Sequence, residues 1–314
     1  MTNWLIFRGS GTQHDDIETL PEPPPWRARK DQDAPAKTYQ VDKKLIEMVN
    51  AALYLRRPLF VAGKPGSGKS TLAHAVAWEL KLGPVLYWPI NTRTTLKDGL
   101  YHYDAIARLQ DASLAEKEGK KAPSIGEYIR LGPLGTAMLP TDRPRVLLID
   151  EIDKSEIDLP NDLLHILERG EFEIPELSRA RAPRVDVRVH GSDQRAVLEK
   201  GVVHCRQFPF IVMTSNGERE FPAPFFRRCL RVDIEPPDPD RLEAIVEAHL
   251  QELSDDAREL LRIFCDQRNQ DDLAVDQLLN AIFLASHGAG LTDEKRDHKR
   301  DLLRQAIFRS LSVL

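Results

Sequence analysis

Apolar residues recur at helical spacing near the start of the main body of the chain. Leu45, Met48, Val49 and Ala52 lie three or four positions apart, which predicts an amphipathic helix. Residues 58–62 follow as a short apolar run that leads into glycines. A run of this length that is bounded by turn residues predicts a buried strand.

Strands and helices are predicted to alternate through the next part of the chain. A helix over 70–82 follows the glycines, and a helix over 159–168 separates two later apolar runs. This alternation implies a parallel sheet with helices on both faces. The predicted fold class is therefore α/β, with three layers in the order αβα. The later apolar runs of strand length are residues 84–90, 145–150, 208–214 and 230–235.

Two stretches depart from this alternation. Residues 98–140 are long and mixed in character. Within residues 171–207, valines at 185, 187 and 189 alternate with charged residues, which is a period of two and typical of a strand with one solvated face. Residues 202–205 are expected to form the returning strand, so that this stretch makes a protruding β-hairpin.

The two ends of the chain have patterns of their own. Residues 240–314 are predicted to be helical, with Leu242, Ile245, Val246 and Leu250 on one apolar stripe. Leu302, Leu303, Ala306 and Ile307 form part of a second stripe, and both are read as the core of a small helical domain. Prolines at 21 and 23–25 prevent a helix there. This segment is either a loose tail or a strap that docks on a partner through Trp26. The predicted domains are 1–40, an N-terminal extension; 41–236, with inserts near 98–135 and 172–207; and 237–314, all-helical.

The charge balance narrows the class of partner. The 314 residues include 44 Lys and Arg against 49 Asp and Glu, for a net charge of −5. A mildly acidic chain has no general attraction to nucleic acid or to anionic lipid. We find no apolar run long enough to span a membrane and no signal peptide at the start. Cys205, Cys229 and Cys265 are widely separated and odd in number, which indicates free thiols and a reducing, cytoplasmic location.

A glycine-rich loop follows the first predicted strand and opens the next helix. It matches the pattern G-x-x-x-x-G-K-[ST] in full. Glycines allow backbone N–H groups to converge on phosphate oxygens, and the helix N-terminus adds a positive dipole end. The lysine would contact the β- and γ-phosphates, and the serine would bind Mg²⁺. The alternative is a glycine-rich surface turn. The matching residues are Gly63, Lys64, Pro65, Gly66, Ser67, Gly68, Lys69 and Ser70.

Two acids end the apolar run at 145–150. Asp150 is expected to hold Mg²⁺, directly or through water, and Glu151 to polarise the attacking water. Adjacent acids are common in loops, but four apolar residues before them are less common. The presence of Glu151 indicates a protein that hydrolyses nucleotide and not one that only binds it.

Polar groups also lie between the last two predicted strands of the sheet. Asn216 ends the run at 208–214 and could hold either the γ-phosphate or the attacking water, or it could simply begin a turn. Arg227 and Arg228 follow a predicted helix, and a guanidinium suits a phosphate. The alternative for this pair is solvated surface arginines.

In this order and spacing, the four motifs resemble those of the AAA+ ATPases and, within them, the MoxR branch. The resemblance covers residues 41–314 and implies a five-stranded parallel sheet in the order 5-1-4-3-2 with a C-terminal helical lid. It implies that Gly63 to Thr71 bind ATP, that Ser70 and Asp150 hold Mg²⁺, and that Asn216 is sensor 1. The stretches that carry the resemblance are 63–71, 147–153, 168–175, 214–220 and 224–229.

The resemblance also implies an assembly and a partner. Arg228, or otherwise Arg227, would be an arginine finger that acts on a neighbouring subunit within a ring, usually a hexamer. The inserts would face the pore of the ring or a partner. MoxR-like proteins act as chaperones on partner proteins, often ones with von Willebrand factor A domains. The chain departs from the family at 270–275, where members commonly carry a basic sensor 2 residue and this sequence has none.

Three functions therefore stay open. The first is a ring-forming ATPase that remodels proteins. The second is a nucleic-acid motor or loader, which the acidic balance disfavours and the basic run at 179–184 favours. The third is an ATP-operated binding switch that hydrolyses slowly, which the missing sensor 2 favours and Glu151 opposes.

Overall fold

The computed structural model divides the chain into two compact units. One unit holds residues 41–63 and 69–234, and the other holds residues 1–40, 64–68 and 235–314. Within these, the structure describes residues 6–7, 9–24, 34–37, 39–250, 255–268 and 274–287. The proposed anchor Trp26, the expected sensor 2 stretch at 270–273 and the stripe at 302–307 lie outside the described residues.

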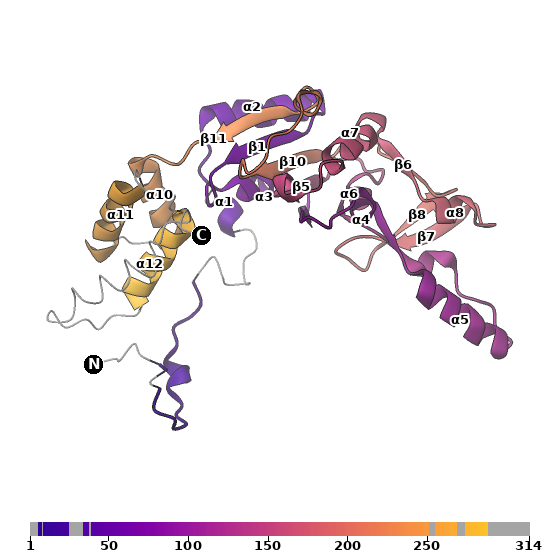
Figure 1. Ribbon diagram of the computed structural model, residues 1–314, viewed down its shortest axis with the longest axis horizontal. Coiled ribbons are helices and arrows are strands. Elements are labelled where there is room, and N and C mark those ends of the chain that lie inside the picture. The colour runs from indigo at the N-terminus through magenta and orange to yellow at the C-terminus, as the bar shows by residue number, and fades with distance from the viewer. Residues whose placement is uncertain are drawn as a thin grey trace. The chain divides into compact units, whose positions relative to one another are not determined.

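The first unit is built around sheet A, whose five strands are all parallel (Figure 1). The strand order is β11-β1-β10-β5-β2, which confirms the predicted order 5-1-4-3-2. The three central strands are almost wholly buried, as expected for a parallel sheet covered on both faces. The strands are β1 (Leu59–Gly63), β2 (Leu86–Pro89), β5 (Val146–Asp150), β10 (Phe210–Ser215) and β11 (Leu230–Ile234).

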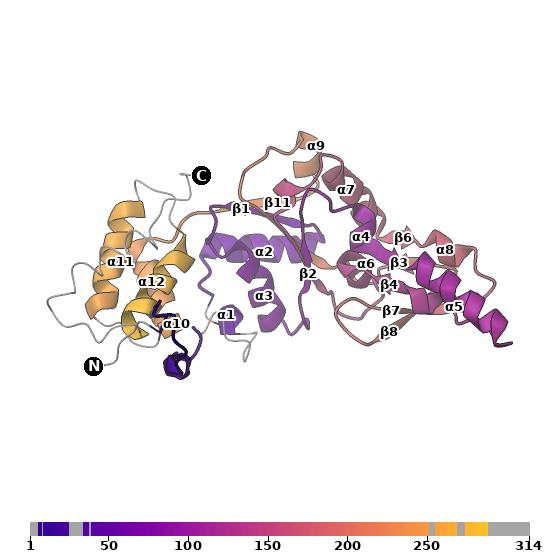
Figure 2. The same cartoon turned by 60° about the horizontal axis from the view of Figure 1, so that its bottom comes forward.

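Helices cover both faces of sheet A, which confirms the predicted αβα layers. On one face, α2 (Lys43–Leu55) packs on β1 and β11, and α3 (Lys69–Glu79) packs on β1, β10 and β5 (Figure 2). The Asp42 side chain caps α2 by accepting a hydrogen bond from the N–H of Leu45 at 2.7 Å. The opposite face is buried in one continuous core with α6 (Pro133–Ala137) and α7 (Leu159–Arg169).

Amphipathic spacing explains how α7 joins this core. Leu159, Leu163, Leu164 and Leu167 recur at helical spacing and are all buried. The helix ends at Gly170, whose φ of 66° is the left-handed conformation that commonly closes a helix. The predicted helix over 159–168 is confirmed, with one more residue at its end.

The two stretches that departed from the alternation together form a second sheet, sheet B. Its order is β3-β4-β7-β8-β9-β6, so strands from both inserts are joined in one surface. The inserts meet where β4 pairs in parallel with β7. Sequence analysis did not predict this pairing. The strands are β3 (Tyr101–Tyr103), β4 (Ile129–Leu131), β6 (Glu171–Glu173), β7 (Arg184–Arg188), β8 (Arg195–Glu199) and β9 (Val202–His204).

The predicted hairpin exists, but its second strand was placed wrongly. β7 pairs in antiparallel register with β8, and residues 202–204 form a third strand that pairs with β6. Two turn signals account for the difference, because Gly191 closes the β7–β8 turn and Gly201 turns the chain again before β9. Both glycines have positive φ, which is the conformation that tight turns require.

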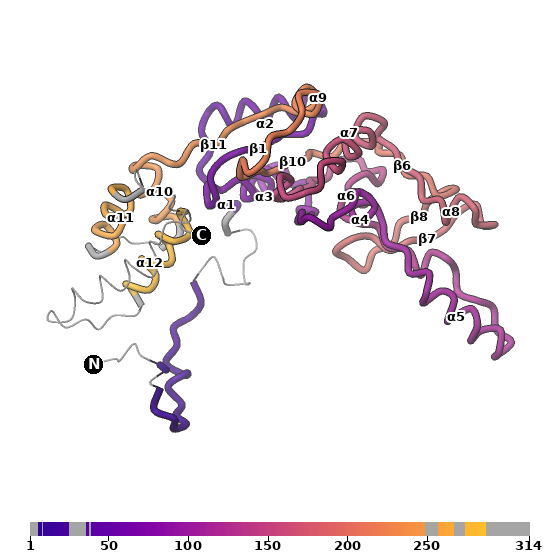
Figure 3. The backbone as a smooth tube through the Cα atoms, in the orientation of Figure 1, coloured from indigo at the N-terminus to yellow at the C-terminus, as the bar shows by residue number. Residues whose placement is uncertain are grey.

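Sheet B has one buried face and one solvated face. Ile129, Leu131, Val185 and Val187 pack into the same core as sheet A, while alternate positions are exposed. Between β3 and β4, helix α5 (Ala105–Lys117) leads away from the sheet, as the tube in Figure 3 shows. Several apolar side chains of α5 are exposed, namely Ile106, Leu109 and Leu114.

Three helices of the second unit, within residues 239–287, share a core of their own. Leu242, Val246, Phe264 and Leu278 are among its buried residues, so two members of the predicted stripe, Leu242 and Val246, do face a helical core. In the described part of the chain, no helix is long and apolar enough to cross a membrane. The helices are α10 (Pro239–Leu250), α11 (Asp255–Arg268) and α12 (Val275–His287). The shorter helices of the chain are η1 (Asp16–Thr19), α1 (Ala34–Lys37), α4 (Leu96–Leu100), η2 (Ile125–Tyr128), η3 (Ile152–Lys154), α8 (Pro175–Ser178) and α9 (Ala223–Phe226).

Candidate functional site

Polar side chains gather at the carboxyl edge of sheet A, where β5 and β10 end beside the start of α3. The Ser70 hydroxyl donates a hydrogen bond to Asp150 Oδ1 at 2.7 Å. Ser70 opens α3 and Asp150 ends β5, so the topology brings together two residues that are 80 positions apart. A hydroxyl and a carboxylate at this distance are a donor set that suits Mg²⁺.

Lys69 lies beside this pair and is buried, with 7% of its surface exposed. Its Nζ donates to the Gly63 carbonyl at 2.8 Å, which joins the start of α3 to the end of β1. Burial lowers the pKa of Lys69, and the negative charges of Asp150, Asp153 and Glu151 oppose that shift. A buried ammonium near three carboxylates suits a site that receives a strongly charged anion with its counter-cation.

Glu151 occupies an unusual backbone conformation directly after β5. Its φ of 58° and ψ of 50° are left-handed, which costs a residue with a Cβ roughly 1–2 kcal/mol. Its N–H donates to Thr214 Oγ1 at 2.8 Å, and that bond holds the strained residue in place. Strain of this kind is concentrated at functional sites.

The Glu151 carboxylate is held from two sides. Lys154 Nζ donates to Oε2 at 2.8 Å, and Asn216 Nδ2 donates to Oε1 at 3.4 Å. The hydrogen bond from Lys154 to Glu151 is also the largest cause of the raised pKa of Lys154. The structure thus places two of the predicted site residues, Glu151 and Asn216, in contact with each other.

Sequence analysis missed Thr214, which links β10 to β5. The residue is 1% exposed, and its hydroxyl donates to Asp150 Oδ1 at 2.6 Å while it accepts from the N–H of Glu151. This one buried hydroxyl therefore donates to the side chain of Asp150 and accepts from the backbone of Glu151. The only signal for this residue was a polar position within an otherwise apolar run.

Asp153 is a second residue that sequence analysis missed. Its Oδ2 accepts hydrogen bonds from the N–H groups of Asn216, at 2.8 Å, and Glu218, at 3.2 Å. The side chain is buried, and Oδ1 has no hydrogen-bond partner among the described residues. Asp153 therefore fixes the backbone that carries Asn216.

Tyr87 closes the site from β2, because its hydroxyl donates to Asp150 Oδ2 at 3.2 Å. Burial, together with the neighbouring Asp150, raises the pKa of Tyr87. Both oxygens of Asp150 are thus occupied by hydroxyl donors, and none of these donors carries a charge. A cation could replace such donors without breaking an ion pair.

The predicted arginines lie elsewhere in this unit, after α9. Four packed phenylalanine rings, Phe60, Phe221, Phe225 and Phe226, anchor that short helix, with ring centroids between 4.9 and 6.1 Å apart. Arg228 forms an ion pair with Glu168 of α7. Arg227 is exposed, and its carbonyl accepts from Arg57 Nη1 at 3.4 Å.

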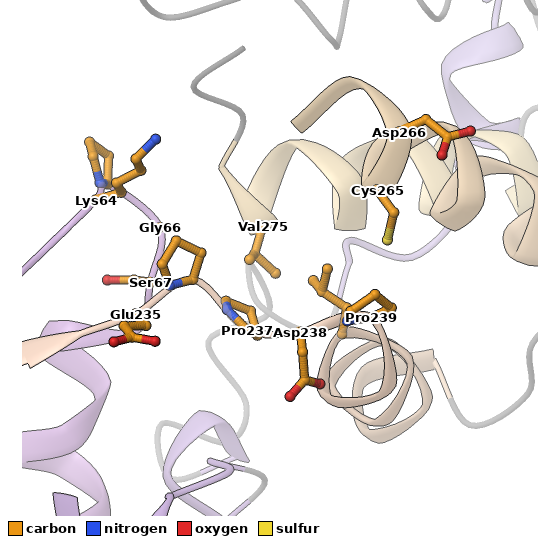
Figure 4. Close-up of a pocket in the computed structure, with 13 residues that line it drawn as sticks. Lys64, Gly66, Ser67, Glu235, Pro237, Asp238, Pro239, Cys265, Asp266 and Val275 are labelled. Carbon is orange, nitrogen blue, oxygen red and sulfur yellow. The ribbon is translucent and has the colours of Figure 1, made fainter. Parts of the chain in front are cut away.

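The loop residues 64–68 belong to the second unit, where residues 64–67 line a cavity of about 740 Å³ (Figure 4). Gly66 and Gly68 have φ of 73° and 83°, so the loop has the left-handed turns that the glycines were predicted to provide. A Cβ added at Gly66 would lie 2.8 Å from the Ala274 Cβ, directly before α12. The other lining residues are Glu235, Pro236, Pro237, Asp238, Pro239, Leu242, Cys265, Asp266 and Val275.

The Ser67 hydroxyl in this loop is buried and has no hydrogen-bond partner among the described residues. A buried donor without a partner costs free energy that a bound acceptor would recover. The loop therefore fits a phosphate ligand. Gly63, Lys64, Pro65 and Thr71 complete the predicted nucleotide-binding stretch, and their roles, like those of the other site residues, stay predictions.

None of the three cysteines forms a disulfide, and burial raises the pKa of Cys229 to about 12. No group of three or more His, Cys, Asp or Glu side chains in the described ranges is arranged to hold a metal ion. A cation at Asp150 would accordingly take most of its remaining ligands from the bound anion and from water.

The fold and this edge of sheet A define an α/β protein of the P-loop NTPase class. The chain belongs to the family described as AAA domain (dynein-related subfamily), whose model matches residues 58–220. AAA domains bind nucleotide and generally hydrolyse it. No curated protein matches this chain.

Two solved structures are similar to this chain at low identity and with low TM-scores. A variant of RuvB from Thermotoga maritima is 18% identical, with a TM-score of 0.37, over 69% of this chain and 53% of that chain. NtrX from Brucella abortus, solved in complex with ADP, is 15% identical, with a TM-score of 0.40, over 78% of this chain and 49% of that chain. This chain spans about half the length of both proteins.

Proposed function

We propose that this protein is a Mg²⁺-dependent ATPase of the MoxR-like type that assembles into a ring, most simply a hexamer, and remodels partner proteins. The observation that carries the proposal is the hydrogen bond between Ser70 and Asp150, because it joins the end of the phosphate loop to the acidic strand. The four motifs that resemble MoxR support the subtype. A partner with a von Willebrand factor A domain is the client class that this resemblance favours.

Each site residue has a distinct role in the proposed reaction. Ser70 and Asp150 would hold Mg²⁺, which neutralises charge on the phosphates when it is bound. Lys69 would bind the β- and γ-phosphates. Glu151 would accept a proton from the attacking water, and Asn216, already in contact with Glu151, would orient that water.

A neighbouring subunit would supply the remaining positive charge through Arg228 or Arg227. In this chain Arg228 is paired with Glu168, and both side chains are partly exposed, so a second subunit could reach the arginine. A surface ion pair is worth at most about 1 kcal/mol, so a phosphate could readily replace Glu168 as its partner. The ring and its trans arginine form part of the proposal.

The decisive experiment mixes two inactive variants. Glu151→Gln lacks the base and keeps Arg228, while Arg228→Ala keeps the base and lacks the arginine. If the arginine acts in trans, mixed rings contain sites with both groups, and ATP turnover returns in the mixture. The assignment of Arg228 is refuted if Arg228→Ala alone is fully active and the mixture shows no recovery. A mixture of Glu151→Gln with Arg227→Ala would then test the other arginine.

A second candidate is an ATP-operated switch that hydrolyses slowly. The specific observation in its favour is the ion pair that holds Glu151 against Lys154. Comparing single-turnover hydrolysis by the unaltered protein, Glu151→Gln and Lys154→Met separates the two. The switch gains support if the first two are equally slow and only Lys154→Met is faster. The ATPase proposal requires the unaltered protein to be much faster than Glu151→Gln.

A further inference from the structure

Four basic side chains form one row across four strands of sheet B. The strand register pairs His102 with Arg130, and Arg130 with Arg188. Arg188 is paired in turn with Arg195. Residues directly opposite each other on neighbouring strands lie on the same face, so these four side chains, here called the basic row, are adjacent. All four are exposed, on the face opposite the core.

This arrangement works against the stability of the sheet. Like charges directly opposite each other on neighbouring strands are destabilising. Glu127 offsets part of that cost, since Arg195 donates to its carboxylate at 2.7 Å and Arg188 lies 3.6 Å away. Arg130 makes neither a hydrogen bond nor an ion pair with any described residue. The row therefore keeps an uncompensated positive charge at its centre.

A neighbouring histidine responds to this charge. His190 follows β7 and is partly buried. Burial, and then the electrostatic influence of the neighbouring Arg130 and His102, lowers the pKa of His190. Adjacent like charges that destabilise a sheet are expected mainly at functional surfaces.

The rest of the exposed face indicates the kind of partner. Val197 lies two residues after Arg195 on β8, on the same face, and 59% of its surface is exposed. Asp186 is opposite Val197, and Glu199 follows on β8, so carboxylates interrupt the positive charge. The outward positions of sheet B carry no Phe, Tyr or Trp: they are His102, Arg130, Glu171, Glu173, Arg184, Asp186, Arg188, Arg195, Val197, Glu199, Val202 and His204.

These features favour a polypeptide over a nucleic acid. Single-stranded nucleic acid is bound by continuous positive grooves with aromatic side chains on which bases stack. This face has a short basic row, nearby carboxylates and an exposed valine. A peptide that carries carboxylates beside a small apolar side chain matches each of these features.

We propose that the basic row binds an acidic segment of a partner protein, with carboxylates on Arg130, Arg188 and Arg195 and a small apolar side chain on Val197. The inference names the partner chemistry of the remodelling function proposed above and rests on that function. The binding itself needs no nucleotide, so it is measured separately from turnover.

The test uses the full chain and a fluorescent peptide of about 12 residues that repeats Glu-Ser-Val-Ser, so that Glu and Val share one face of the extended peptide. Fluorescence anisotropy is measured against a matched peptide with Gln in place of Glu, and against a single-stranded oligonucleotide of about 20 nucleotides. Arg130→Gln removes the central charge, and the double variant Arg130→Gln/Arg188→Gln removes two. Arg206→Gln is the matched control, because Arg206 is exposed and pairs with Asp142 outside the row.

We expect the Glu peptide to bind and the Gln peptide to bind at least about tenfold more weakly, since hydrogen bonds to charged groups are the stronger ones. Arg130→Gln should weaken binding about tenfold, the double variant should abolish it, and Arg206→Gln should leave it unchanged. Binding should weaken as salt rises.

Other outcomes overturn the inference. It fails if the oligonucleotide binds through the row and the Glu peptide does not, if neither binds, or if Arg206→Gln weakens binding as much as Arg130→Gln. ATP turnover of the same samples keeps the two proposals apart. If the protein hydrolyses ATP but does not bind the peptide, only the proposal about the basic row is refuted. If it binds the peptide through the row but does not hydrolyse ATP, only the ATPase proposal is refuted.

Discussion

Sheet A and sheet B arrange polar side chains in opposite ways. At the edge of sheet A, Asp150, Thr214 and Asp153 lie in a largely buried network where each hydrogen bond has a defined partner. On sheet B, the basic row is exposed and its charges lie beside like charges. Burial makes every lost hydrogen bond costly, and exposure lets solvent and salt weaken every interaction. The first arrangement suits chemistry, and the second suits recognition.

The largest expected effect comes from removing the base at sheet A. Glu151→Gln should lower ATP turnover roughly 10²- to 10⁴-fold, which is the usual contribution of general base catalysis. Nucleotide affinity, measured by titration calorimetry, and peptide binding by the basic row should both be retained. Glu156→Gln, an exposed neighbour, is the control and should turn over normally. Loss of nucleotide binding in Glu151→Gln would contradict the assigned role.

Removing the hydroxyl that joins the two acids should have the next largest effect. Thr214→Val keeps the shape of the side chain but leaves Asp150 Oδ1 and the Glu151 N–H short of a partner. The free energy of unfolding in urea should fall by about 1–3 kcal/mol, and turnover should fall about tenfold or more. Thr214→Ser keeps the hydroxyl and should restore most of both. A Val variant as active as the unaltered protein would exclude a positioning role for Thr214.

The junction between the two inserts can be disturbed without touching sheet A. A Cβ added at Gly126 would lie 1.9 Å from the Asp186 carbonyl oxygen, so Gly126→Ala forces η2 away from β7. We expect a loss of about 1–3 kcal/mol in the free energy of unfolding, as for overpacked sites, and weaker peptide binding. Lys121→Ala is the control, because Lys121 is exposed and lies a few residues before Gly126 in the same insert. Equal losses in both variants would show that close packing at the junction is not the cause.

The smallest expected effect is at the ion pair between Arg228 and Glu168. Glu168→Gln frees the arginine for a neighbouring subunit, and a surface pair contributes only about 0.2–1 kcal/mol. The protein concentration for half-maximal turnover should therefore fall by at most about fivefold. Glu171→Gln, which removes a nearby carboxylate paired with His204, is the control. A higher half-maximal concentration in Glu168→Gln would indicate that the pair supports assembly.

Much of sheet A could be predicted because its signals are local. Each strand is an apolar run. Asp150, Glu151 and Asn216 come at the ends of those runs or directly after them, and Lys69 opens the helix that follows the first run. In parallel strands the carboxyl ends share one edge, so local positions sufficed to predict a common site. Thr214 and Asp153 were missed because their hydrogen-bond partners lie on other strands and loops, beyond the reach of a motif.

The sequence by itself determined the αβα layers, the strand order of sheet A through its family resemblance, and which residues lie at its carboxyl edge. Only the tertiary structure decided that β4 pairs with β7, and hence that Arg130 and Arg188, 58 positions apart in the sequence, are neighbours (188 − 130 = 58). The physical reason is that alternation along a strand fixes which face a side chain occupies. It does not fix which strand lies alongside, because that choice depends on pairing between distant segments.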